Sequence, residues 1–335
     1  MCSNWSRTGL LARVLAAALV TALACACSQG GRPATADARS ASPSPSAAAS
    51  PSPPLPPTPT PVPQQVEAGL PLPRQEVASA ASGQALFVIG GFDAGRRDSN
   101  SVFVYTGSWS RGPDFPVPID HASAATLKGA VYVAGGNSAG RAQAFLFRLE
   151  EGGWTRLSPM RHARGALALV AAGDRLFALG GLAAGAEVAV VEAYEPATNS
   201  WSDVTTLPQP RDHGAGFAIS GAVCLAGGRF PTSARVDCYD PRLDSWSRLS
   251  DLPEPTSGAG AAVLGSEIVV AGGENAAESR LVDRVFRLQG GTWSGEPMLI
   301  ARHGVQLASF GGRAWACGGA TAAGYRAAAD CTSIS

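Results

Sequence analysis

Apolar and polar positions alternate along the chain in short blocks, and six of the apolar blocks end in a pair of glycines. The first is ALFVIGG at residues 85–91, and the first glycines of the pairs lie 45, 45, 47, 45 and 46 residues apart. A short apolar run that ends in glycine is typical of a buried strand followed by a tight turn. A fixed interval of this length indicates one structural unit for each block. The repeated pairs are Gly90 and Gly91, Gly135 and Gly136, Gly180 and Gly181, Gly227 and Gly228, Gly272 and Gly273, and Gly318 and Gly319.

Each unit is predicted to contain four short antiparallel strands. In the fourth repeat we expect them at residues 214–220, 222–228, 234–240 and 245–253, with turns between them that contain Gly, Ser, Pro and Asp. The first strand of most repeats consists largely of alanine and glycine, as in GAGFAIS. Small side chains suit an innermost strand, because several sheets that converge on one axis leave little room there. The pattern therefore predicts an all-β protein with sheets arranged radially.

A tryptophan opens the expected fourth strand in five of the six repeats. It follows the first glycine of its repeat by 19 or 21 residues. A large ring at the same place in every sheet is expected to fill space between neighbouring sheets rather than to stack on a ligand. These residues are Trp109, Trp154, Trp201, Trp246 and Trp293.

These features together resemble the kelch motif, which builds β-propellers. The resemblance consists of the apolar strand ending in Gly-Gly, the apolar or aromatic third strand, the later tryptophan, and a Pro/Arg/His cluster before the next repeat. It covers residues 66–335, although repeat two has RLEEGGW in place of a Tyr-Asp-Pro turn and repeat six lacks its tryptophan. WD repeats have a similar period, but their terminal Trp-Asp and their Gly-His are absent. The resemblance implies a six-bladed kelch-type propeller.

The two ends of the repeat region predict how this ring closes. The sixth repeat reaches its third strand in AAADCTSIS, whereas QQVEAGLPLPR at residues 64–74 resembles a fourth strand that precedes the first repeat. We therefore expect residues 64–70 to supply the outermost strand of the last blade. Such pairing would leave no exposed interior edge.

Residues 1–27 have the pattern of an export signal. Arg7 and Arg13 precede an apolar run at residues 14–26 that is shorter than the roughly 20 residues needed to span a bilayer as a helix. LACACSQGG at residues 23–31 resembles the lipobox of bacterial lipoproteins, with Cys27, or alternatively Cys25, as the lipidated residue. We expect an exported protein at the cell surface or in the periplasm, attached to the membrane by a lipid anchor only.

Residues 28–65 consist almost entirely of Pro, Ala, Ser and Thr. Such a segment has little apolar surface to bury, so we expect an unfolded, extended linker between the signal and the propeller. The predicted organisation is a signal peptide at 1–27, a linker at 28–65 and a propeller at 66–335.

Charge and cysteine content limit the kinds of ligand, covalent bond and metal site that we expect. The 26 basic and 26 acidic residues give a net charge of +0, which argues against a nucleic-acid-binding surface. Cross-strand disulfides Cys224–Cys238 and Cys317–Cys331 are compatible with the spacing, although cysteine is also a common small buried residue. The sequence has no CxxC motif and no Cys/His cluster, so we expect no metal site and no cofactor.

All four histidines fall in loops that join the last strand of one repeat to the first strand of the next, where arginines accompany them. The loops after the glycine pairs emerge on the same face and add further arginines. One interpretation is that these side chains bond backbone carbonyls between blades. The other is that they line the mouth of the central channel of the propeller and bind an anionic or hydroxyl-rich ligand there. The candidate ligand contacts are Arg161, His162, Arg164, Arg211, His213, Arg229, Arg302 and His303, with the loop at 161–164 preferred. The remaining histidine, His121, is not among these candidates.

Two functions follow as hypotheses. The first is a monomeric, membrane-tethered, non-catalytic platform for a protein, peptide or glycan. The alternative is an extracytoplasmic carbohydrate-active enzyme. It would be similar either to kelch-type mutarotases or epimerases, with Glu187 or Glu274 and Arg229 as an acid/base pair, or to kelch-type copper oxidases. The chain has no nucleophile elbow, paired-carboxylate motif or phosphate loop. Two carboxylates or three metal ligands within reach of one another at the channel mouth would favour the enzyme.

Overall fold

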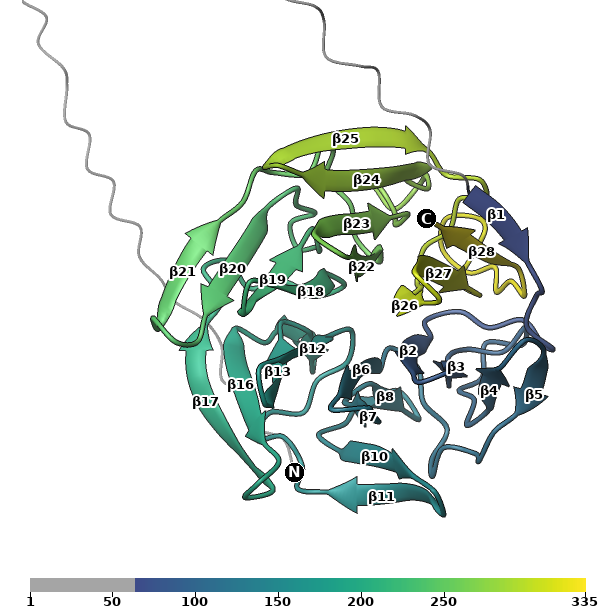
Figure 1. Ribbon diagram of the computed structural model, residues 1–335, viewed down its shortest axis with the longest axis horizontal. Coiled ribbons are helices and arrows are strands. Elements are labelled where there is room, and N and C mark those ends of the chain that lie inside the picture. Colours follow the sequence, from purple (N-terminus) through teal and green to yellow (C-terminus); the bar gives the residue numbers. More distant parts are fainter. Residues whose placement is uncertain (1–63) are drawn as a thin grey trace, which may run out of the picture. The chain divides into compact units, whose positions relative to one another are not determined.

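The computed structural model describes residues 64–335, and all regular secondary structure in this part of the chain is β. Six four-stranded antiparallel sheets surround a central axis as the blades of a propeller (Figure 1). The predicted all-β, six-bladed architecture is therefore confirmed. The predicted signal, Cys25, Cys27 and the linker up to residue 63 lie outside the described residues. Within residues 64–335, no helix is long and apolar enough to cross a membrane.

The strands of each blade follow one another from the axis outward. Blade one contains β2 (Ala78–Ser82), β3 (Ala85–Ile89), β4 (Val102–Tyr105) and β5 (Trp109–Arg111). Blade two contains β6 (Ser123–Leu127), β7 (Ala130–Ala134), β10 (Leu146–Glu150) and β11 (Gly153–Leu157). Blade three contains β12 (Ala168–Ala172), β13 (Arg175–Leu179), β16 (Val190–Glu195) and β17 (Ser200–Thr206).

The other three blades repeat this order. Blade four contains β18 (Ala215–Ile219), β19 (Ala222–Ala226), β20 (Val236–Asp240) and β21 (Ser245–Arg248). Blade five contains β22 (Gly260–Leu264), β23 (Glu267–Ala271), β24 (Arg284–Gln289) and β25 (Thr292–Pro297). Blade six contains β26 (Ala308–Phe310), β27 (Arg313–Cys317), β28 (Cys331–Ile334) and β1 (Gln64–Glu67). Two small hairpins, β8 (Asn137–Ser138) with β9 (Arg141–Ala142) and β14 (Leu182–Ala183) with β15 (Ala186–Glu187), extend the loops after β7 and β13.

The innermost strands form a closed circle of neighbours, in which β2 contacts both β6 and β26. Small side chains are required there. A Cβ atom added to Gly216 of β18 would lie 2.5 Å from the Cβ of Ala168 in β12, and one added to Gly260 of β22 would lie 2.6 Å from the backbone nitrogen of Leu307. These distances explain why the first strand of each repeat is rich in Ala and Gly.

The glycine pairs connect neighbouring blades. Gly135 and Gly136 have φ angles of 61° and 91°, in the left-handed region that glycine adopts without steric cost. The N–H of Gly136 donates to the carbonyl of Arg164 in the next blade (2.9 Å), and a Cβ on Gly135 would lie 2.5 Å from the same oxygen. The pair thus both turns the chain and allows two backbones to come into contact, as the sequence predicts.

The repeated tryptophans also lie between blades, as predicted. Each indole Nε1 donates a hydrogen bond to the preceding blade. The acceptors are Ala68 O for Trp109 (2.7 Å), Pro113 O for Trp154 (3.0 Å), Ser158 O for Trp201 (3.0 Å), Thr205 Oγ1 for Trp246 (3.0 Å) and Ser250 O for Trp293 (2.8 Å). The apolar core follows the same plan, because its buried clusters combine residues from neighbouring blades.

The outer strand of the sixth blade comes from the other end of the described chain. β1 lies beside β28 (Figure 1) and pairs with it antiparallel, so that Gln64 is opposite Ile334. Because β1 begins at Gln64, the last two residues of the predicted linker, 64 and 65, belong to the sheet.

Both predicted disulfides are present. Cys224–Cys238 joins β19 to β20, and Cys317–Cys331 joins β27 to β28. In each case the two cysteines are directly opposite each other in neighbouring strands. The bonds therefore link the second and third strands of blades four and six.

Candidate functional site

Six residues, one from each blade, form a closed ring of backbone hydrogen bonds around the axis. Each N–H donates to the carbonyl of the ring residue in the preceding blade, over distances from 2.8 to 3.1 Å. All six have φ angles between 52° and 67°. In chain order the ring residues are Glu76, His121, Ala166, His213, Gly258 and Gly304.

The repeat fixes this backbone position but leaves its side chain free to vary. Every ring residue lies fourteen positions before the first glycine of its repeat. The residue just before it forms a β-bridge with the residue that follows the glycine pair, for example Asp120 with Asn137 and Asp212 with Arg229. The bridges hold the ring in place, so its side chains point from a rigid backbone into a shared space. Three of the side chains are ionisable and three are Ala or Gly.

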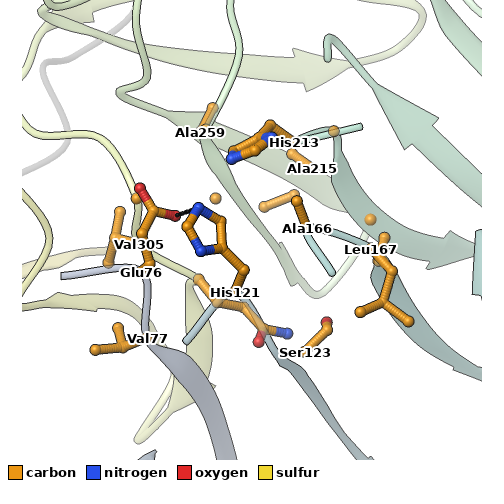
Figure 2. Close-up of a pocket in the computed structure, with 18 of the residues that line it drawn as sticks. Glu76, Val77, His121, Ser123, Ala166, Leu167, His213, Ala215, Ala259 and Val305 are labelled. Carbon is orange, nitrogen blue, oxygen red and sulfur yellow. Dashed lines mark ion pairs between the residues drawn. The ribbon is translucent and has the colours of Figure 1, made fainter. Parts of the chain in front are cut away.

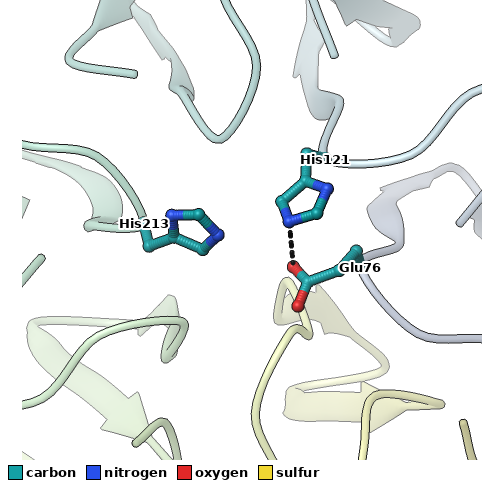
Figure 3. Close-up of side chains that lie close together, drawn as sticks. All are labelled: Glu76, His121 and His213. Atoms are coloured by element: carbon teal, nitrogen blue, oxygen red, sulfur yellow. Dashed lines mark ion pairs between the residues drawn. The ribbon is translucent and has the colours of Figure 1, made fainter. Parts of the chain in front are cut away.

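The ionisable ring side chains lie close together (Figure 3). Nε2 of His121 is 3.5 Å from Oε2 of Glu76, and the rings of His121 and His213 meet edge to face with centroids 5.0 Å apart. Gly304 makes room for Glu76, since a Cβ there would lie 2.7 Å from its carboxyl carbon. One ligand atom from each of Glu76, His121 and His213 can be chosen so that all lie within 4.8 Å of one another.

Each histidine is oriented by the aspartate that precedes it. Nδ1 of His121 contacts the carboxylate of Asp120, and Nδ1 of His213 lies 2.6 Å from Oδ1 of Asp212. Both aspartates are buried. The Nε2 atom of each imidazole is thus the one directed away from its aspartate partner.

A cavity of about 170 Å³ opens over the ring, and we call it the mouth cavity. Arg229 is held there by Asp212 Oδ1 (3.0 Å) and Glu278 Oε1 (2.8 Å), and its Nη2 donates to Nε2 of His213 (3.3 Å). His303 lies with Nε2 2.8 Å from the carbonyl of Gly324. The lining includes Glu76, Phe92, His121, His213, Arg229, Glu274, Glu278 and His303.

A second, smaller cavity lies along the axis next to the ring and is lined mainly by Ala, Gly, Leu and Val side chains (Figure 2). Gln306 borders it and spans two innermost strands. Its Oε1 accepts hydrogen bonds from the backbone N–H groups of Ser79 (3.1 Å) and Ala124 (3.0 Å), and its Nε2 donates to Ala124 O (2.6 Å). Gln306 therefore satisfies backbone groups that the innermost strands leave without a ladder partner.

The electrostatics of the ring keep Glu76 ionised. Burial alone raises its pKa, but the nearby His121, His213, His303 and Arg229 outweigh this effect and lower the pKa to about 2. The two ring histidines differ from each other. Burial lowers the pKa of His121, yet Glu76 and Asp120 more than compensate and raise it. Burial lowers the pKa of His213, and the contact with Asp212 does not offset this.

Three predicted ligand contacts are structural instead. Arg164, Arg211 and Arg302 are fully buried, so they are not available to a ligand in the channel. Their guanidinium groups donate to the carbonyl of the first glycine of their own repeat, at Gly180 (3.1 Å), Gly227 (2.6 Å) and Gly318 (2.5 Å) respectively. These arginines do bond backbone carbonyls, but within their own blade rather than between blades, and their assignment as ligand contacts is wrong.

The preferred loop at 161–164 is not at the channel mouth. The side chains of Arg161 and His162 are 57% and 40% exposed and pair with Asp203 in the outer strand β17, at 3.6 and 3.4 Å. Neither residue lines the mouth cavity. The last residue of this loop, Arg164, is anchored inside blade three, where it donates to carbonyls of its own repeat.

The remaining candidates, His213, Arg229 and His303, do meet at the mouth cavity, where Glu274 joins them but Glu187 does not. Sequence analysis did not select Glu76 or His121. Their offset from the glycine pair is the signal that identifies them, because it places both in the same ring as His213. The mouth thus contains three potential metal ligands within reach of one another, the feature expected to favour an enzyme.

Comparison with known proteins agrees with this architecture. Residues 73–116 and 163–208 match the Kelch motif family. The solved structure of YjhT superposes with a TM-score of 0.68 at 17% sequence identity, covering 78% of this chain and 95% of YjhT, a level of identity that shows a shared fold alone. No curated protein matches the sequence. Six repeats, six blades and these matches identify the fold as a six-bladed β-propeller of the kelch type.

Proposed function

We propose that the mouth cavity binds a small, hydroxyl-rich ligand such as the end of a glycan. The observation that carries the proposal is the composition of the lining, in which Glu274, Glu278 and Arg229 lie in one concave site. Sugar hydroxyls both donate and accept hydrogen bonds, so they suit a site with carboxylates as acceptors and a guanidinium as donor.

An aromatic ring adds an apolar surface to this lining. Phe92 borders the mouth cavity and contacts the edge of His121, with centroids 5.6 Å apart. Small-molecule sites typically combine such apolar contacts with a few placed polar groups. A protein or peptide that inserts one side chain is the competing occupant.

The proposal includes export and lipid tethering, as residues 1–63 predict. The two disulfides support export, because such bonds persist in oxidising compartments and are rare in the cytosol. A tether at Cys27 or Cys25 followed by an extended linker would hold the propeller away from the membrane surface.

A carbohydrate-active enzyme is the second candidate, favoured by the group of Glu76, His121 and His213 directly beside the mouth cavity. Catalysis would be detected by NMR as interconversion of sugar anomers or epimers in the presence of the full chain. If turnover occurs at this site, Glu76→Gln abolishes it. A ligand that is bound but not converted assigns the protein to the binding class.

The binding proposal is tested by screening the full chain against glycans and peptides and then repeating the screen with Arg229→Gln. Loss of one charge-assisted hydrogen bond is expected to weaken binding about 10- to 100-fold. The double variant Arg161→Ala/His162→Ala, outside the mouth cavity, is the matched control and should bind as the unmodified chain does. Glycan binding that survives Arg229→Gln unchanged, or binding of peptides alone, would contradict the proposal.

A further inference from the structure

Three side chains from three blades converge in the ring with the chemistry of a metal site. Glu76 contributes a carboxylate, and His121 and His213 contribute imidazoles (Figure 3). Two imidazoles and one carboxylate are a recurrent ligand set for divalent transition metals in proteins. The separation of 3.5 Å between Nε2 of His121 and Oε2 of Glu76 is close to the roughly 3.4 Å between ligand atoms of a tetrahedral centre with bonds of about 2.1 Å.

The aspartates behind the histidines are the second, independent observation. Metal-binding histidines usually donate their other ring N–H to a carboxylate, which fixes the tautomer and the orientation of the ring. Here Asp120 and Asp212 contact Nδ1 of His121 and His213 respectively. The repeat places the same Asp-His dipeptide in blades two and four, and both aspartates are buried. The arrangement directs Nε2 of each histidine away from its aspartate, toward Glu76 in the case of His121 and toward Arg229 in the case of His213.

The charge of the site also suits a cation. Glu76, Asp120 and Asp212 bring three carboxylates to the ring, and the buried Glu274 adds a fourth beside it. Among the described residues that line the mouth cavity, Arg229 alone carries a permanent positive charge. A divalent ion would balance this excess of negative charge in a partly desolvated site.

We propose that Glu76, His121 and His213 bind one divalent transition-metal ion, of which Zn²⁺ fits the donor set best. Arg229 must yield its contact of 3.3 Å with Nε2 of His213, but it keeps its stronger contacts with Asp212 and Glu278. Three protein ligands leave a coordination position open, as in zinc sites that bind an exchangeable molecule. The inference does not depend on the identity of the ligand in the mouth cavity.

The test uses the full chain, stripped of metal with a chelator and titrated with Zn²⁺ by calorimetry and with Co²⁺ by visible absorption. We expect one ion per chain and the d–d absorption of four- or five-coordinate Co²⁺. His121→Ala and His213→Ala should each weaken binding by more than about 100-fold, and Asp212→Asn by about 10- to 100-fold. The control His162→Ala removes an exposed histidine outside the ring and should bind as the unmodified chain does.

The ring variants are expected to fold, because Ala166 already occupies the equivalent position with a φ of 53°. Glu76→Gln provides a variant of nearly unchanged size. Binding at other than one ion per chain, or one-ion binding that persists in both histidine variants, would overturn the proposal. No glycan is present in the titrations, and Arg229→Gln is expected to retain the metal, so this result is separate from the outcome of the glycan screen.

Discussion

Buried arginines occupy the same position in four of the blades, and the residue at the partner position differs among them. We call one position in the third strand of each blade the partner position. It is directly opposite the second-strand residue that comes two positions before the first glycine of the glycine pair. Glu192 occupies it for Arg164, and Asp237 occupies it for Arg211. Blades two and five have no arginine at this place, and phenylalanine fills the partner position. Charge and counter-charge therefore occur together in blades three and four, as expected for groups removed from water.

Blades one and six depart from this rule. In blade one, the buried Arg74 lies over the ring of Phe103, which takes the partner position. In blade six, Arg302 is fully buried, and its partner position is taken by Thr332. Arg302 Nη2 and Thr332 Oγ1 are buried atoms without a hydrogen-bond partner among the described residues. Burial lowers the pKa of Arg302 to about 10, and the more distant Asp330 only partly offsets this effect. The guanidinium still carries its charge at neutral pH but lacks a carboxylate in contact.

We predict that Thr332→Asp stabilises the protein. The new carboxylate would face Arg302 and complete its hydrogen bonds, raising the free energy of unfolding by about 1–3 kcal/mol. Urea unfolding at pH 7 measures the change. Thr332→Asn places a side chain of nearly the same shape as aspartate there without the charge, and should give little of the gain. The double variant Thr332→Asp/Arg302→Met should be less stable than either single variant, because the new carboxylate is then buried without a counter-charge. A Thr332→Asp variant that is less stable than the unmodified chain contradicts the prediction.

The counter-charge in blade four makes stability depend on pH. Burial raises the pKa of Asp237, but the hydrogen bond from Arg235 and the charge of Arg211 outweigh it and lower the pKa. A carboxyl group with a lowered folded-state pKa stabilises the fold above its unfolded pKa of about 3.9, and the contribution disappears as the pH falls through the folded value. The effect should therefore be complete at pH 7 and reduced at pH 3.

Asp237→Asn is accordingly predicted to cost about 3–5 kcal/mol at pH 7, because Arg211 is left buried without its counter-charge. The difference from the unmodified chain should shrink as the pH falls below about 4. Urea unfolding at several pH values between 7 and 3 measures both effects. Asp251→Asn, which breaks a surface pair with Arg248, is the control and should change stability by less than about 1 kcal/mol. A cost for Asp237→Asn that is independent of pH would show that the carboxylate charge is not responsible.

At the scale of elements, the sequence predicts the features that follow from turn chemistry and strand register, but not the direction in which a repeated side chain points. The glycine pairs, the tryptophans and both disulfides are where the 45-residue pattern places them, because each depends on local turn chemistry or strand register. The ligand assignment of Arg164, Arg211 and Arg302 fails although these residues share one position in the repeat. Whether an arginine faces a channel or a backbone carbonyl depends on packing between strands, which the repeat alone does not specify.

Glu76 and His121 illustrate the other limit. They lie in the same loop position as His213, but no short motif joins residues that are 45 and 92 positions apart. Only the radial arrangement of the blades brings them together, because backbone hydrogen bonds join the equivalent residues of all six blades into one ring. Superposing the repeats by their glycine pairs identifies the ring, whereas searching for closely spaced metal ligands does not.

At the scale of the molecule, the ring is held by a strand pair that joins the two ends of the described chain. β1 supplies the outer strand of blade six, and Trp109 of blade one donates to Ala68 just beyond it. Val66 in β1 is 65% exposed, so the strand contributes mainly backbone hydrogen bonds rather than apolar burial. Without those bonds, β28 would become an exposed edge that is able to pair with another chain.

Proline substitutions in β1 test this closure in the full chain. In an edge strand, neighbouring residues direct their N–H groups alternately toward the sheet and toward solvent. Gln65→Pro and Val66→Pro therefore form a matched pair. Gln65→Pro is expected to lose a ladder hydrogen bond to β28, whereas Val66→Pro replaces an N–H that is directed toward solvent. The first should lose about 1–3 kcal/mol of stability and associate at high concentration, and the second should behave like the unmodified chain. Thermal unfolding and light scattering measure the two effects, and equal behaviour of both variants would show that pairing of β1 with β28 does not hold the ring closed.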